Sequence, residues 1–190
     1  MVSEKTGPGR RKRPPKPLDE AKLRDLALHY VARFATSSAK LERYLTRKLR
    51  ERGWGGERDP DVPALVASHV EAGYIDDDAY ARMRAGSLTS RGYGARRVAQ
   101  VLHADGLAED VRAAHAPDER AQREAILRYA KRRRFGPFAA DPAAAASDRA
   151  LREKQLAAMV RAGHSFDHAR AALDARSETA LEEWVGEYEC

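Results

Sequence analysis

The chain has 190 residues, of which 43% are hydrophobic, 34% charged and 7% aromatic. This composition can form a modest core, and no apolar run approaches the roughly 18 residues that span a bilayer. The single cysteine, Cys190, has no intrachain partner, which excludes disulfides and cysteine-ligated zinc within the chain. Because the amino terminus also lacks the apolar core of a secretory signal, we expect a soluble, cytoplasmic protein.

Alanine and leucine dominate the apolar residues. The chain has 36 Ala and 16 Leu, against 10 Val, 5 Thr and 2 Ile. Since β-branched residues favour strands whereas alanine and leucine favour helices, this balance predicts an all-α fold.

The formal net charge of +6 is unevenly distributed. Residues 1–17 carry six basic side chains, one acid and four prolines, and we expect this basic tail to be disordered. The rest of the chain is nearly neutral, with 29 basic and 28 acidic side chains. Within it, residues 79–104 hold five arginines and no acid, residues 120–134 hold seven basic side chains and one acid, and residues 174–190 hold six acids and one arginine. The body of the protein is therefore electrically polarised.

The hydrophobic pattern predicts helices from Leu18 onward. Apolar residues of the first segment, up to Phe34, recur with the i, i+3, i+4, i+7 spacing of one helical face. A second helix follows the N-cap candidates at residues 36–38, and a third follows Asp59 or Asp61. These three helices would occupy residues 18–75.

The same order of elements occurs twice more. Residues 76–117 predict three further helices, and residues 118–176 predict three more, with a loop over Phe135–Ser147. A glycine ends the middle helix of each set, at Gly53, Gly106 and Gly163. We therefore predict an all-α protein of three tandem three-helix repeats, about nine helices in all, stacked into an elongated, curved molecule. Residues 177–190 are expected to form a separate acidic segment.

A family resemblance rests on the end of the first set and on the second. The residues that carry it there are Val70, Glu71, Ala72, Gly73, Tyr74, Ile75, Asp76, Asp77, Tyr80, Ala81, Arg91, Gly92, Tyr93, Gly94, Arg96, Arg97 and Val98. The first set agrees through Tyr30, Ala32, Arg33, Leu41, Leu45, Leu49 and Gly53. In these residues the chain resembles the RecX family, bacterial regulators of the RecA recombinase. The resemblance covers roughly residues 20–175 and is looser in the third set, where residues 139–147 depart from the pattern.

The resemblance implies a helical protein that lodges along the groove of a RecA filament on single-stranded DNA. It implies inhibition of strand exchange, ATP hydrolysis and coprotease activity, and hence a role in recombination, DNA repair and the SOS response. We expect a monomer without a cofactor, for which direct binding to DNA is weak.

Three motifs that suggest chemistry have simpler interpretations. The aspartates at 76–78 are interpreted as a helix cap with first-turn charges rather than a metal cluster. The glycines flanking Tyr93 lack the third glycine of a dinucleotide site, and we expect a turn with the tyrosine filling its corner. His164 and His168 have the spacing of two zinc ligands but no third ligand. Because no catalytic set is found, we do not expect an enzyme.

The basic residues are the candidate contacts, because they recur at comparable stages of each repeat. They are Arg43, Arg47, Arg50, Arg82, Arg91, Arg96, Arg97, Arg123, Arg132 and Arg133. In a curved row of repeats they would form a stripe able to meet phosphates or acidic groups of a filament. The alternative is that they are ordinary solvated helix faces, as the acids Glu42 and Glu51 near Arg43 suggest.

The sequence also fits a different function. The protein could be a stand-alone DNA-binding regulator whose helices and basic tail grip duplex DNA. A sequence reader is expected to project a few base-reading side chains from one helix, whereas here the basic residues are spread over all repeats. That distribution favours the filament.

Overall fold

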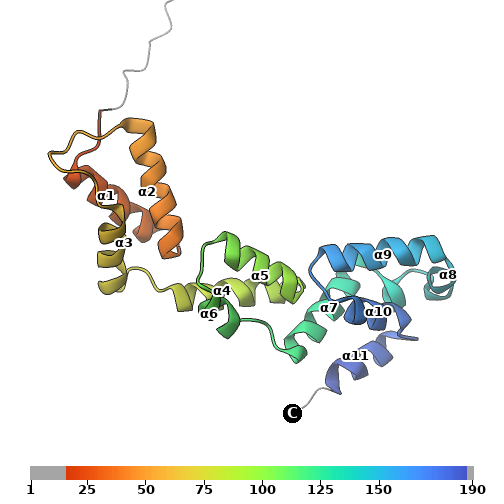
Figure 1. Cartoon of the computed structure of the whole chain (residues 1–190). Coiled ribbons are helices and arrows are strands. Elements are labelled where there is room, and N and C mark those ends of the chain that lie inside the picture. Colours follow the sequence, from red (N-terminus) through yellow and green to blue (C-terminus); the bar gives the residue numbers. More distant parts are fainter. Residues whose placement is uncertain (1–15, 188–190) are drawn as a thin grey trace, which may run out of the picture.

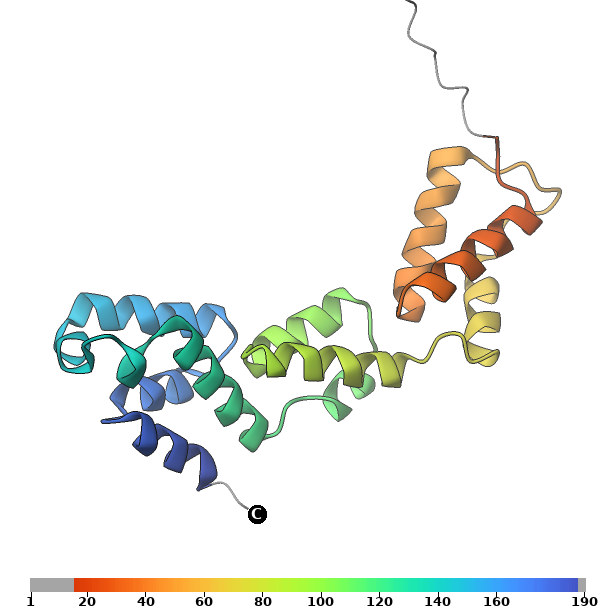
Figure 2. The same ribbon diagram turned by 180° about the vertical axis from the view of Figure 1, so that it is seen from behind.

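The computed structural model describes residues 16–187, and the expected disorder of the tail falls almost entirely on residues 1–15, outside this range. The described residues form eleven α-helices and one short 3-10 helix, and their single β feature is an isolated bridge between Leu18 and Trp54. The helices form an elongated, bent molecule (Figures 1 and 2). The structure thus confirms the all-α class. None of the described helices is long and apolar enough to cross a membrane.

Three separate hydrophobic clusters divide the molecule into what we call the first, second and third units. The helices of the first unit are α1 (Glu20–Arg33), α2 (Ser38–Arg52) and α3 (Val62–Glu71). Each begins at a residue whose side chain accepts an N–H of the first turn, namely Asp19, Ser37 and Asp61. Leu18, Leu41 and Leu45 are fully buried in the core between them.

The second unit is the smallest. Its helices are α4 (Asp77–Ser90), α5 (Ala95–Ala104) and α6 (Glu109–Ala114). Val98 and Leu102 of α5 are fully buried, and they pack with Tyr80, Ala85 and other residues of α4. Such a small core gains stability from its neighbours, because burial per residue rises with the size of a folded unit.

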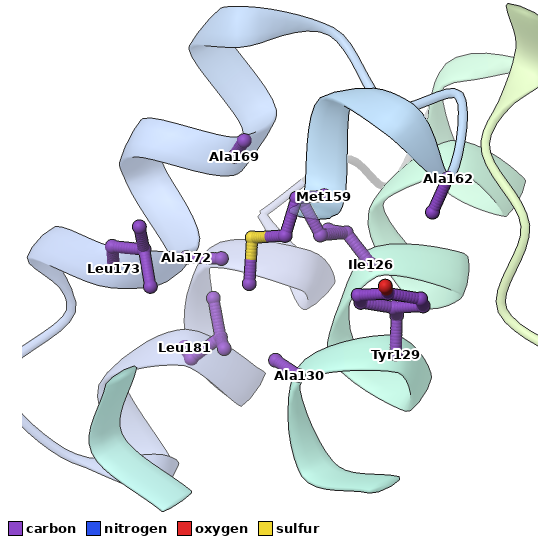
Figure 3. Close-up of a cluster of buried hydrophobic side chains, with 9 residues drawn as sticks. All are labelled: Ile126, Tyr129, Ala130, Met159, Ala162, Ala169, Ala172, Leu173 and Leu181. Atoms are coloured by element: carbon purple, nitrogen blue, oxygen red, sulfur yellow. The ribbon is translucent and has the colours of Figure 1, made fainter. Parts of the chain in front are cut away.

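The third unit is the largest. Its elements are α7 (Glu119–Arg133), the 3-10 helix η1 (Gly136–Phe138), α8 (Pro142–Ser147), α9 (Arg149–Arg161), α10 (Phe166–Asp174) and α11 (Glu178–Gly186). Figure 3 shows Met159 of α9 at the centre of this core, surrounded by Ile126, Ala172 and Leu181 from three other helices. Met159, Ile126 and Leu181 are fully buried.

Two helices lie where none was expected. α8 lies in the stretch predicted as a loop, because Asp141 caps a run of alanines that begins with Pro142. α11 lies in the segment expected to be separate and acidic, and Ser177 caps it. Its Leu181 is buried against α7 in the third core, while its acids face outward. The acidic composition of this segment had obscured its apolar face.

Candidate binding face at the joint between the second and third units

The second and third units meet through α5 and α9 and also through α4 and α7. The N–H of Gly94 donates to the carbonyl of Ala162 (3.0 Å), and the N–H of Arg96 donates to the carbonyl of Gly163 (3.1 Å). α5 has no side-chain cap, so the carbonyls at the end of α9 satisfy the N–H groups at its start. The negative end of one helix dipole thereby meets the positive end of the next. This backbone connection fixes the position of the side chains that follow Gly94.

A buried histidine links the same two units. His164 is 1% exposed, and its Nε2–H donates to the carbonyl of Gly92 (3.1 Å). Its ring also meets the ring of Tyr129 edge-on, with 5.5 Å between centroids. Burial lowers the pKa of His164 to about 4, although the bond to Gly92 acts in the opposite direction. The ring is therefore neutral at pH 7.

The turn between α4 and α5 behaves as the sequence predicted. Gly92 has a φ of +80°, a conformation that favours glycine, and Tyr93 packs against both the second and the third core. The side chain of Tyr93 therefore fills the corner between the two units.

Three of the candidate arginines meet at this joint. The guanidinium of Arg132 donates to the carbonyl of Arg91 and lies over the ring of Tyr129, 5.4 Å from its centroid. The guanidinium of Arg91 turns back onto its own helix, where it bonds the carbonyl (3.0 Å) and hydroxyl (2.8 Å) oxygens of Ser87. Arg133 lies over the ring of Phe135 at 5.4 Å.

Arg96 and Arg97 are exposed on the first turn of α5. Their backbone is held by α9, and within the described range neither guanidinium forms a hydrogen bond or ion pair with another residue. Both are therefore available to an external partner from a rigid position.

A hollow of about 380 Å³ lies at the joint, and we call it the joint hollow. Its lining residues are Tyr93, Tyr129, Arg132, Arg133, Ala158, Arg161 and Ala162. No acid is among them. Arg161 is not among the predicted contacts, because the positions two residues before the other helix-ending glycines are Glu51 and Ala104. Repetition between the sets therefore did not point to it.

The arginines of α2 lie apart from this joint, on the first unit. Arg43, Arg47 and Arg50 line a second hollow of about 700 Å³ together with the stacked rings of Tyr30 and Tyr44, whose centroids are 4.3 Å apart. Arg43 donates to the carbonyl at the end of α5 (3.1 Å), so it also connects the first two units.

The remaining candidates differ in their surroundings. Arg82 is exposed on α4. Arg123 instead faces inward: it bonds Glu119 (2.8 Å) and the carbonyl of Trp184 (2.8 Å), and it lies 4.4 Å from the centroid of that indole. The structure therefore does not place Arg123 on a shared face with the others. Arg123 instead holds α11 against α7.

The aspartates at the start of α4 have structural partners. Asp76 caps the helix, which confirms the capping interpretation. Asp77 reaches the first unit, where it accepts the N–H (2.8 Å) and hydroxyl (2.5 Å) of Ser38. Asp78 pairs with His115 at 2.7 Å. These carboxylates thus connect elements of the fold.

The joint between the first and second units consists of side-chain contacts. Ser37 Oγ donates to the carbonyl of Asp105 (2.7 Å). The carboxylate of Asp105, whose side chain is 13% exposed, accepts from Tyr80 (2.8 Å) and Lys40 (3.2 Å) and lies 3.3 Å from Arg84. This joint is made by side chains around the Asp105 carboxylate, whereas the joint between the second and third units also includes hydrogen bonds between backbone groups.

The two histidines considered as metal ligands have different roles. His168 contacts Glu119 (2.9 Å) and the ring of Trp184, within the third unit. His164 instead bonds Gly92 of the second unit. Across residues 16–187 no group of three His, Cys, Asp or Glu side chains could hold a metal ion. The chemistry that the joint offers is that of guanidinium donors, which suit phosphate and carboxylate oxygens.

Comparison with known proteins supports one family. A scan against models of protein families finds no match. The chain is 34% identical over 186 residues to the regulatory protein RecX of Myxococcus xanthus, covering 92% of this chain and 98% of the relative. It is 30% identical over 158 residues to the regulatory protein RecX of Halorhodospira halophila, covering 82% and 89%.

The fold agrees with a solved structure. The crystal structure of RecX from Lactobacillus salivarius superposes with a TM-score of 0.62, covering 86% of this chain and 94% of the other, at 16% sequence identity. This likeness shows a common helical fold. Together with the identity and coverage of the two relatives, it shows that the chain belongs to the RecX family of regulatory proteins.

Proposed function

We propose that this protein is a cytoplasmic regulator that binds the RecA filament on single-stranded DNA and restrains it. Strand exchange, ATP hydrolysis and coprotease activity by RecA would be inhibited as a result. Membership of the RecX family supports the proposal. The mechanism is occupancy of the filament by a monomer, and it needs no cofactor, metal ion or chemical step from this chain.

The arginines at the joint between the second and third units are the observation that supports a contact surface there. Arg96 and Arg97 are exposed and start from a backbone fixed by α9. At the same joint the guanidinium of Arg132 donates to the backbone carbonyl of Arg91. Side chains on a fixed backbone lose less conformational entropy on binding than those of a disordered segment, and guanidinium groups pair well with phosphates and carboxylates. The elongated molecule also carries Arg43, Arg47 and Arg50 on its first unit, so it could span neighbouring filament subunits.

The measurement that tests the proposal is ATP hydrolysis by RecA on single-stranded DNA. Substoichiometric protein is expected to slow it, and reversal of the joint arginines, Arg91→Glu, Arg96→Glu and Arg97→Glu together, is expected to abolish the inhibition. The matched control is reversal of Arg24, Arg120 and Arg149, which changes the net charge equally but lies outside the joint. Circular dichroism must show that both variants fold.

Two results would contradict the proposal. A titration to equimolar protein without any change in the rate of hydrolysis would defeat the assignment to RecA. Equal inhibition by wild type and the joint variant would place the contact surface elsewhere. Cosedimentation distinguishes a filament-binding protein from a stand-alone DNA-binding regulator. The regulator would sediment with bare DNA as well as with filaments.

The basic tail is a second source of positive charge. Deleting residues 1–17 removes six basic side chains and one acid. If long-range attraction governed binding, this deletion would weaken it about as much as the arginine reversal, and both effects would fade with salt. We expect the deletion to reduce affinity only modestly, because charges in a fixed geometry form specific contacts.

A further inference from the structure

The joint hollow brings three positive charges together without an acid. Arg132 and Arg133 come from the end of α7, and Arg161 comes from the end of α9. Like charges repel one another, and the repulsion is relieved when an anion lies between them. In the described chain Arg161 has no hydrogen bond or ion pair of its own. The arrangement therefore favours a bound anion.

A structural role at helix ends does not account for this cluster. Basic side chains in a last turn can stabilise the negative end of a helix. At the end of α9, however, the carbonyls of Ala162 and Gly163 already accept N–H groups from α5. Arg132 donates to the carbonyl of Arg91, in the other unit. Stabilisation of their own helix ends therefore does not explain the positive charge of these arginines.

We propose that the joint hollow is a phosphate-binding site, and that the phosphate belongs to a nucleic-acid strand. Guanidinium groups form paired hydrogen bonds with phosphate oxygens, and here they come from the ends of two helices. At about 380 Å³ the hollow has room for a phosphate group. Arg96 and Arg97 are exposed at the start of α5, where it meets the end of α9, so they add positive charge next to the hollow, as a strand with repeated phosphates requires.

The hollow lies where the second and third units meet. Its lining combines Tyr93 from the second unit with residues of α7 and α9 from the third. Because the three arginines all belong to the third unit, a phosphate bound to them stabilises that unit against unfolding, and it lies beside Tyr93 of the second unit. The identification of the strand as part of a filament rests on the proposed function, whereas binding of phosphate is a property of the isolated protein.

The test uses the full-length protein and two single variants. Arg161→Gln removes one guanidinium from the hollow, and Arg149→Gln is the control, on the same helix with a side chain that is 91% exposed. Inorganic phosphate is expected to raise the melting temperature of wild type and of the control above that in chloride of equal ionic strength. Arg161→Gln is expected to lose this increase.

Binding of a fluorescent oligo(dT) identifies the source of the phosphate. Arg161→Gln is expected to weaken it about tenfold, the loss of one charge-assisted contact. The slope of log K against log salt should also become shallower by about 0.7, as for one lost contact to a single strand. Arg149→Gln should leave both quantities close to wild type.

Each other outcome has a definite meaning. Equal losses in both variants would show general electrostatic attraction and overturn the site. Stabilisation by phosphate, with oligonucleotide binding unaffected by Arg161→Gln, would assign the hollow to free phosphate and overturn the nucleic-acid source. If Arg161→Gln weakened the binding of poly-glutamate but not that of oligo(dT), the hollow would belong to an acidic protein surface, and the nucleic-acid source would be overturned. Inhibition of RecA by wild type, measured separately, stands or fails independently of these results.

Discussion

Gly94 and Gly163 lie so close together that a β-carbon on Gly94 would be 2.3 Å from the carbonyl carbon of Gly163. This approach allows the end of α9 to cap the start of α5 directly. A side chain at either position would separate the carbonyls from the N–H groups that they satisfy. The joint therefore depends on two glycines that are distant in sequence.

Substituting either glycine is expected to destabilise the joint. Gly94→Ala should lower the free energy of unfolding by about 1–3 kcal/mol, the usual cost of overpacking. Gly163→Ala should cost at least as much, because Gly163 also has a φ of +96°. Urea unfolding followed by circular dichroism measures both effects.

The control is a glycine in open space. Gly86 lies within α4, and a β-carbon there would meet no heavy atom within 4 Å. Gly86→Ala should raise stability by about 0.5–1 kcal/mol, since alanine favours the helix. Equal stability of all three variants would show that the units do not meet as described.

Much of the fold could be predicted because its helices are amphipathic and end at glycines. The stripe of apolar residues leading to Phe34 and the glycines at 53, 106 and 163 are local signals, and α1, α2, α5 and α9 lie where they indicate. α11 escaped prediction because six acids between residues 174 and 190 outweigh its few apolar side chains in any count of composition.

The candidate site was harder to predict, because its features arise between units. The capping of α5 by α9 pairs backbone groups almost 70 residues apart, which no local pattern records. Arg161 has no equivalent in the other sets, so only the folded chain brings it beside Arg132 and Arg133. Conversely, Arg123 matched the expected recurrence, yet it bonds Glu119 and packs on Trp184.

The joint between the first and second units should show energetic coupling. In a double-mutant cycle, Lys40→Met and Asp105→Asn are expected to couple by about 1 kcal/mol, because both side chains are partly buried and also contact Tyr80. Chemical unfolding at low and high salt measures the coupling. The comparison pair, Arg149 and Glu153, has side chains 91% and 65% exposed, and its coupling should be close to zero. Similar values for the two pairs would contradict the role of this network.

His164 should make stability depend on pH. The pKa of His164 is about 4 in the folded protein and about 6.5 in the unfolded chain, so between these pH values its ring binds a proton only in the unfolded chain. Stability should therefore fall as pH decreases from about 6.5 to about 4, by a total of about 3 kcal/mol. His164→Gln can keep a donor for the carbonyl of Gly92, and it should lose this part of the pH dependence.

The control for this experiment is His103→Gln, on an exposed position of α5. It is expected to keep the wild-type curve, so the difference between the two variants isolates the buried ring from the titration of carboxylates. Parallel curves for wild type and His164→Gln between pH 7.5 and 5 would show that His164 is not buried at the joint.

The last prediction tests whether α11 belongs to the third core. Leu181 is fully buried against α7, and Figure 3 shows it pointing toward Met159 and Ala130. Leu181→Ala should lower the free energy of unfolding by about 2–5 kcal/mol, because it removes apolar contacts and leaves a cavity. The neighbouring Glu182→Ala is exposed and should change it by less than about 0.5 kcal/mol. The fluorescence of Trp184 reports the same region, since its indole lies between α11 and α7. If both variants unfold as wild type does, the acidic segment is an appendage, and the third unit is complete without it.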